Sequence, residues 1–255
     1  MFIDTHAHLY HKQFDADRTE MLARAVDAGV GKLFLPNIDL ESADAMHALA
    51  AAHPELCFPM MGLHPTSVTE DPARDLAGIE KLLREGRYYA VGEIGIDLYW
   101  DKTRLAQQQE AFRKQVRWAK ELSLPVVIHC RDAFDEVFRI VEDEQDGSLR
   151  GVFHCFTGTV EQARLITGLG GFMLGIGGVI TYPKSGLAQV LADVGPADCV
   201  LETDAPYLAP VPHRGKRNES AHIPVVAHVL ATATATALAD IERITTANAE
   251  RLFAV

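Results

Sequence analysis

The sequence lacks the short motifs that identify several common classes of protein. None of its four cysteines, Cys57, Cys130, Cys155 and Cys199, forms a CxxC pair, so neither a zinc knuckle nor a dithiol redox motif is present. No predicted strand is followed by GxGxxG, and GxxxxGK[ST] does not occur, so neither dinucleotide binding nor a P-loop is predicted. We expect the four thiols to be free and buried in a reducing compartment.

Positive charge and membrane-spanning runs are also scarce. The chain carries 24 Lys and Arg against 35 Asp and Glu, a formal net charge of −11, which argues against broad adhesion to nucleic acid or anionic membranes. Its N-terminus, MFIDTHAH, has an Asp where a signal peptide has its apolar stretch. The uncharged run 221–239 contains Pro224 and several polar residues, which favours a buried helix opened by proline. We therefore expect a cytoplasmic protein with no membrane partner.

What the sequence does contain is an alternation of β-rich runs with amphipathic helical stretches such as Arg104–Leu122. The β-rich runs are FIDTHA, KLFLPN, LCFPMMG, YAVGEIG, PVVIHC, GVFHCF, GFMLGIGG and CVLETD. Eight strands, each followed by a helix, predict a single (β/α)8 TIM-type barrel over residues 1–255. Such a barrel carries its active site at the C-terminal ends of the strands.

Histidines and carboxylates stand at the ends of five predicted strands, where unpaired polar groups would be costly. They are His6, His8, Glu93, His129, His154, Glu202 and Asp204. His6 and His8 are two residues apart, so on a strand they share one face. Imidazoles and carboxylates that converge at a barrel mouth predict a site for Zn²⁺ or Mn²⁺, and less readily for Mg²⁺. Four histidines with Glu93 and Asp204 exceed the needs of one catalytic zinc, which favours two divalent ions bridged by one carboxylate and an anionic substrate.

Other polar residues give weaker indications. His64 in MGLHP is a candidate hydrogen-bond donor or acid, and Glu202 is expected to make a structural hydrogen bond one layer below Asp204. Asp4 could orient a ligand histidine or cap the local backbone. In the basic loop VPHRGKRN, we expect Arg214 and Lys216 to contact substrate phosphates, and Arg217 and His213 to face water.

Taken together, these motifs resemble the TatD family of metal-dependent deoxyribonucleases, a branch of the amidohydrolase-like hydrolases with a β/α barrel. The matching segments are DTHAHL, GLHP, VGEIGID, VVIHCR, HCFTG, ETDAPYLAP, RGKRNE and TTANAERLF. The resemblance implies that His6, His8 and Asp204 hold one metal, that His129 and His154 hold the other, and that Glu93 bridges them. It also implies that Asp204 orients or deprotonates the attacking water and that His64 contacts the scissile phosphate.

Two positions depart from the pattern of this family. Leu98 stands where many members have an aromatic residue, so Tyr99 or Trp100 would have to supply any stacking on substrate. Ser220 replaces a proline at the end of the basic loop, a change expected to make that loop more mobile.

The predicted activity is hydrolysis of phosphodiester bonds in DNA, or in RNA, by a metal-activated water at a binuclear site. We expect a monomer that trims single-stranded ends. The alternatives are a small-molecule amidohydrolase, lactonase or phosphotriesterase on the same barrel, and an ester hydrolase acting on aminoacyl-tRNA. Many binuclear members of the wider group bridge their metals with a carboxylated lysine from strand four, whereas this chain has Glu93 there, which favours the nuclease.

Overall fold

The computed structural model describes all 255 residues and confirms the eight predicted strands. The strands are β1 Phe2–Asp4, β2 Val30–Leu35, β3 Cys57–Pro59, β4 Val91–Asp97, β5 Val126–Arg131, β6 Gly151–Phe153, β7 Phe172–Ile176 and β8 Cys199–Leu201. All neighbouring pairs are parallel, in the orders β1-β2-β3 and β4-β5-β6-β7-β8. Most strands end earlier than predicted, because the residues that follow them turn toward the barrel mouth.

Two seams join these sheets into a ring. Between β3 and β4, a parallel bridge links Met61 with Val91, and the Gly92 amide donates to the Met61 carbonyl at 3.0 Å. Between β8 and β1, the Thr5 amide donates to the Leu201 carbonyl at 3.0 Å, and a parallel bridge links Ala7 with Ala205. The fold is therefore the predicted α/β barrel of TIM type.

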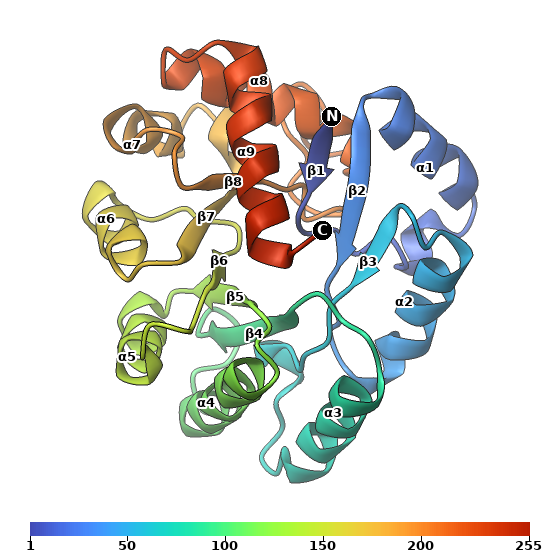
Figure 1. Ribbon diagram of the computed structural model, residues 1–255, viewed down its shortest axis with the longest axis vertical. Coiled ribbons are helices and arrows are strands. Elements are labelled where there is room, and N and C mark those ends of the chain that lie inside the picture. The colour runs from blue at the N-terminus through green and yellow to red at the C-terminus, as the bar shows by residue number, and fades with distance from the viewer.

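Helices surround the strands (Figure 1). They are α1 Arg18–Asp27, α2 Leu40–Ala52, α3 Ala73–Glu85, α4 Leu105–Glu121, α5 Phe134–Glu144, α6 Val160–Gly168, α7 Leu187–Val194, α8 Ile223–Ala233 and α9 Leu238–Phe253, with short 3-10 turns η1 Lys12–Phe14, η2 Pro65–Ser67, η3 Gly178–Thr181 and η4 Ser220–His222. Local sequence explains several helix starts: Asp39 with Ser42 and Thr159 with Gln162 form capping boxes at α2 and α6.

The uncharged run 221–239 forms two helices rather than one. Pro224 lies in the first turn of α8, as predicted, but the chain leaves that helix after Ala233 and begins α9 at Leu238. No single helix is long and apolar enough to cross a membrane; Ser220–Ala233 and Leu238–Phe253 reach the required length and hydropathy only as a pair, with a 113° bend between them.

Helix α9 closes the end of the barrel opposite the strands' C-terminal ends. Ala249, Leu252 and Phe253 join a buried cluster with Ile3, Val127 and other inward-facing residues from the strands. The Phe253 ring lies 4.1 Å from that of Phe34, and α9 is nearest the viewer in Figure 1. With this end filled by side chains, access to the barrel interior is left to the mouth.

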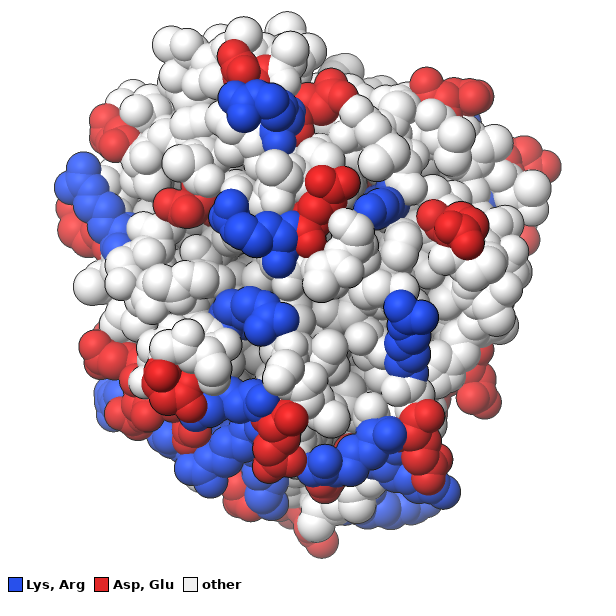
Figure 2. All heavy atoms as spheres, viewed as in Figure 1, with Lys and Arg blue, Asp and Glu red and all other residues white.

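All four thiols are free, as predicted, but they are not equally buried. Cys57 and Cys199 are buried, whereas Cys130 and Cys155 are partly exposed because each lies at a strand end beside the mouth. On the face that α9 covers, Lys and Arg are interspersed with Asp and Glu (Figure 2). Where α4 packs on α5, for example, Arg113 and Arg117 both pair with Glu144. The charges of Arg113 and Arg117 are therefore neutralised by Glu144.

Candidate metal centre

The predicted donor residues converge at the mouth of the barrel, although several lie at other places along their strands than expected. His6 and His8 follow β1 rather than lying on it, because the ladder ends at Asp4. Glu93 is the third residue of β4, not its last, and Asp97 ends that strand. His154 comes directly after β6, and Asp204 follows β8 by three residues.

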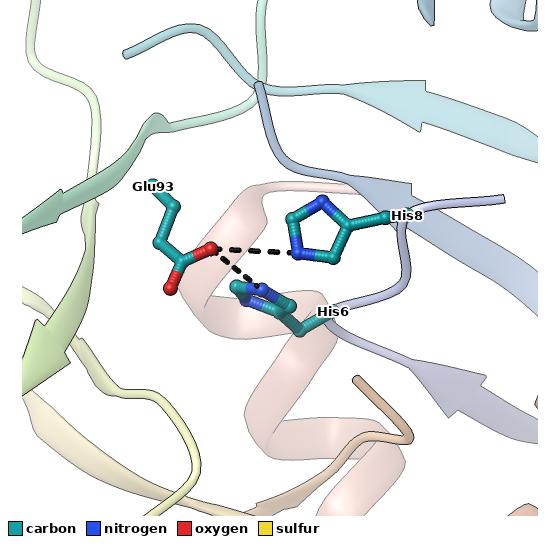
Figure 3. Close-up of side chains that lie close together, drawn as sticks. All are labelled: His6, His8 and Glu93. Atoms are coloured by element: carbon teal, nitrogen blue, oxygen red, sulfur yellow. Dashed lines mark ion pairs between the residues drawn. The ribbon is translucent and has the colours of Figure 1, made fainter. Parts of the chain in front are cut away.

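Glu93 is the centre of the cluster. Its Oε2 lies 3.2 Å from His6 Nε2 and 3.5 Å from His8 Nε2 (Figure 3). Its Oε1 faces a different set of nitrogens, at 2.8 Å from His129 Nδ1 and 3.7 Å from His154 Nε2. His64 Nε2 also lies 3.3 Å from Oε1, so the two oxygens of one buried carboxylate face different sets of imidazoles.

Asp204 adds a second carboxylate beside the same nitrogens. Its Oδ1 lies 3.8 Å from His6 Nε2, 3.6 Å from His8 Nε2 and 3.9 Å from His154 Nε2. Burial alone would raise the pKa values of Asp204 and Glu93, but the facing histidines lower the pKa of Asp204 and bring that of Glu93 well below its ordinary value. Both groups are therefore carboxylates at neutral pH.

His6 provides a test of whether this cluster suits a metal ion. The residue is fully buried, and neither of its ring nitrogens makes a hydrogen bond. Burial lowers the pKa of His6, which favours the neutral imidazole. A buried imidazole without partners is costly, whereas a neutral imidazole beside carboxylates is what a divalent cation requires. The residues therefore fit a divalent metal, and the ligand atoms of His6, His8 and Glu93 lie close enough together to share one ion.

Tyr10 determines which nitrogen of His8 is available for a metal. The Tyr10 hydroxyl donates to the Pro36 carbonyl at 2.6 Å, so it can accept the proton that His8 Nδ1 presents at 3.1 Å. With a cation bound at Nε2, which faces Glu93, His8 would carry its hydrogen on Nδ1. Sequence reasoning missed Tyr10, and its position two residues after His8 was the only signal available.

Two carboxylates lie against the outer nitrogens of the other histidines. Asp97 Oδ2 accepts from His129 Nε2 at 2.9 Å, which leaves Nδ1 to face Glu93. Glu202 Oε1 lies 2.9 Å from His154 Nδ1, which leaves Nε2 toward the cluster. Glu202 also accepts the Cys155 amide at 2.6 Å, consistent with its predicted structural role. Asp97 was not predicted, but it lies four residues after Glu93 on the same face of β4.

Asp4 holds the two chain segments that carry His6 and Asp204. Its carboxyl accepts from the Thr203 hydroxyl at 2.6 Å, from the Thr203 and His6 amides, and from the Ser220 hydroxyl at 2.6 Å. Ser220 is completely buried. Ser220 is therefore anchored by its burial and by its hydrogen bond to Asp4, contrary to the expectation that it makes the end of the basic loop more mobile.

His64 has the geometry of a donor rather than a ligand. It lies five residues after β3 at the start of η2, where its Nδ1 accepts the Thr66 amide at 3.2 Å. The ring proton then belongs on Nε2, which lies 3.3 Å from Glu93 Oε1. A metal ligand needs a bare nitrogen, so this arrangement suits donation of a hydrogen bond.

The basic loop contains cations with different surroundings. Arg214 and Lys216 are exposed, and the Arg214 guanidinium lies 4.4 Å from the centre of the Tyr182 ring. Arg217 does not face water as predicted, because it makes two hydrogen bonds with Asp17 at 2.6 and 2.7 Å and covers the Phe14 ring. His213 is partly exposed and stacks on His222, with ring centres 4.1 Å apart.

Comparison with known proteins gives consistent matches over the whole chain. The family described as "TatD related DNase" matches residues 3–254. An uncharacterized metal-dependent hydrolase of Bacillus subtilis, YabD, is 36% identical over 100% of both chains. A "3'-5' ssDNA/RNA exonuclease TatD" of Cronobacter sakazakii is 38% identical over 94% of this chain and 93% of its own. The crystal structure of YjjV, a TatD homologue from Escherichia coli, is 32% identical, covers 100% of this chain and 98% of its own, and superposes with a TM-score of 0.93.

Proposed function

Because the chain belongs to the TatD-related DNase family, we propose that it trims single-stranded DNA from one end, with RNA as a second substrate. Family membership makes the protein a metal-dependent hydrolase acting on ester bonds. The observation that best supports our finer proposal is Glu93, whose Oε2 faces His6 and His8 while its Oε1 faces a different set of imidazoles, as expected of a bridging carboxylate in a two-metal site.

In this proposal, His6, His8 and Asp204 hold one divalent cation, His129 and His154 hold the other, and Glu93 bridges them. Imidazole-rich sites favour Zn²⁺ or Mn²⁺ over Mg²⁺. When bound, two such cations lower the pKa of water, neutralise the non-bridging phosphate oxygens and stabilise the leaving oxygen.

Asp204 orients the attacking water in this mechanism. Its side chain is 16% exposed, so one edge of the carboxylate is accessible from the mouth while Oδ1 faces the histidines. Because its pKa is low, Asp204 stays ionised: it accepts a hydrogen bond from water but is a weak base toward the proton that the water loses. The backbone at Asp204 has φ of 57°, an uncommon conformation for a residue other than glycine and typical of functional positions.

His64 donates to a non-bridging oxygen of the scissile phosphate. Its Nε2 hydrogen points into the cluster, and its Nδ1 is held by the Thr66 amide and hydroxyl. Burial lowers the pKa of His64, which favours a neutral ring that donates without becoming an ion. Arg214 and Lys216, which carry no carboxylate partner, are proposed to bind flanking phosphates at the rim.

The nuclease activity is preferred over the small-molecule alternatives because a relative of similar length is named a 3'-5' ssDNA/RNA exonuclease. From that name we also propose removal of nucleotides in the 3′ to 5′ direction. The monomeric state and the cytoplasmic location stay predictions; light scattering during size-exclusion chromatography tests the first.

The test compares Glu93→Ala with Glu55→Ala, a matched change at an exposed position. Each protein is purified, its metal content is measured, and 5′- and 3′-labelled oligonucleotides are digested with Mn²⁺, Zn²⁺ or Mg²⁺. We expect Glu93→Ala to lose both metal and cleavage, and Glu55→Ala to retain both. Full activity of Glu93→Ala would exclude the proposed bridge, while turnover of lactones or aminoacyl-tRNA without cleavage of oligonucleotides would replace the proposed substrate.

A further inference from the structure

Two aromatic side chains lie uncovered at the end of β4. Trp100 is 73% exposed and Tyr99 is 53% exposed, whereas Trp118, the other tryptophan, is buried. The two exposed rings meet edge to face, with centres 4.8 Å apart. Exposed apolar groups that lie together beside a functional site are typical of ligand-binding surfaces.

Arg131 completes this group. Its guanidinium carbon lies 3.8 Å from the centre of the Tyr99 ring and 5.8 Å from that of Trp100. Unlike Arg113 and Arg117, which pair with Glu144, Arg131 forms no ion pair. An unpaired cation stacked on aromatic rings offers a site for an anion next to a site for a flat, unsaturated ring.

The register of β4 and β5 places Arg131, and the strand end that Tyr99 and Trp100 follow, on the mouth side of the metal centre. Gly95 pairs with His129, and Asp97 pairs with Arg131. Because side chains two residues apart on a strand share a face, Arg131 lies one layer above His129, and Asp97, four residues after Glu93, lies two layers above Glu93. Asp97 joins the two layers: its Oδ2 accepts from His129, and its Oδ1 accepts the Tyr99 amide at 3.0 Å.

We propose that Tyr99, Trp100 and Arg131 form a nucleobase-binding platform for the substrate strand, which rests on the proposed nuclease function. A base stacks on the exposed indole, and Arg131 pairs with the phosphate next to that base. The platform selects single strands, because a base within a duplex is already covered on both faces by its neighbours. It compensates for the scarcity of cations in this acidic chain, since stacking adds affinity without further charge.

The kinetic test measures cleavage of oligothymidylate and of the same oligonucleotide with abasic sites near the labelled end. We expect Trp100→Ala to raise KM by about 5- to 150-fold, the range for loss of one stacked base, with the effect falling on KM rather than kcat. Abasic sites should raise KM for the wild-type protein by a similar factor and have little further effect on Trp100→Ala. Trp100→Phe should restore part of the loss, and Leu165→Ala, another exposed apolar position, serves as the control.

A binding test is independent of cleavage. With EDTA present, tryptophan fluorescence is titrated with oligothymidylate; quenching should occur in the wild-type protein and disappear in Trp100→Ala, whose remaining tryptophan is buried. Cleavage with an unchanged KM for Trp100→Ala would refute the platform and leave the nuclease proposal standing. Quenching without any cleavage of nucleic acid would refute the nuclease proposal alone. A dimer that dissociates in Trp100→Ala while the KM stays constant would assign the surface to a second copy of this chain, which also refutes the platform.

Discussion

Asp97→Asn is a sharp test of how the metal centre is organised. In the wild-type protein, Asp97 Oδ2 accepts from His129 Nε2 at 2.9 Å, and Oδ1 accepts the amides of Tyr99 and Trp100. Asparagine has the same shape, but its amide group must face either His129 or the two backbone donors. If it faces His129, the ring proton moves to Nδ1, and His129 can no longer offer a bare nitrogen beside Glu93.

The size of the effect follows from this exchange of hydrogen bonds. A buried hydrogen bond to a charged acceptor contributes about 1.5–3 kcal/mol and a neutral one about 0.5–1.5 kcal/mol, so the free energy of unfolding should fall by about 1 kcal/mol. For a chain of this length that corresponds to a decrease in Tm of roughly 3 °C. Loss of a partner that orients a ligand histidine should weaken metal binding by about 10- to 100-fold.

Isothermal titration with Mn²⁺ and differential scanning calorimetry measure the two quantities on the same sample. Asp101→Asn is the matched control, because Asp101 lies in the same loop and contacts Thr103 rather than a histidine. Wild-type metal affinity in Asp97→Asn would contradict the proposed control of the His129 proton. Collapse of the fold, with a decrease in Tm far beyond that predicted, would show that Asp97 acts mainly on stability.

Three further outcomes are expected. Ser220→Ala removes a hydrogen bond to the buried carboxyl of Asp4 and should lower the free energy of unfolding in urea by about 1–2 kcal/mol; an unchanged midpoint would contradict this role. Addition of Mn²⁺ at about 100 times its Kd to EDTA-treated protein should raise stability by about 2.7 kcal/mol, and a Tm that does not depend on Mn²⁺ concentration would exclude a site of the native state. Burial raises the pKa of Cys57 and of Cys199 from 9.0 to about 12, so both thiols should resist iodoacetamide at pH 8 until the protein unfolds; rapid labelling of the native protein would contradict their burial. Because the thiols ionise at lower pH in the unfolded chain, the free energy of unfolding should also fall as pH rises from 9 toward 12.

Much of this protein could be predicted from local pattern alone. The β-rich and helical runs indicate eight β/α units, because each strand or helix buries apolar residues that recur at a regular spacing within a short segment of the sequence. His6, His8, His129 and His154 were identifiable because ionisable residues at the ends of apolar strands are costly unless something pairs them. What the pattern indicated was the set of donors, not the direction in which each donor points.

The tertiary structure determined the partners, because these come from segments far apart in the chain. Tyr10 reaches the Pro36 carbonyl, Asp4 reaches Thr203 and Ser220, and Arg217 reaches Asp17. No local periodicity encodes such contacts, which depend on how strands close into a ring. For the same reason Arg217 was wrongly expected to face water.

The ring nitrogen that each histidine directs toward the metal centre shows most clearly what the sequence determines and what the tertiary structure determines. The sequence alone determined that histidines and carboxylates meet at the barrel mouth, since hydrophobic periodicity specifies both the strands and their ends. Only the folded chain decided that His8 and His154 present Nε2 while His129 presents Nδ1, because Tyr10, Glu202 and Asp97 each engage the opposite nitrogen. The position of a histidine proton depends on which acceptor lies within hydrogen-bond distance of the ring, and that distance is set only by the tertiary structure.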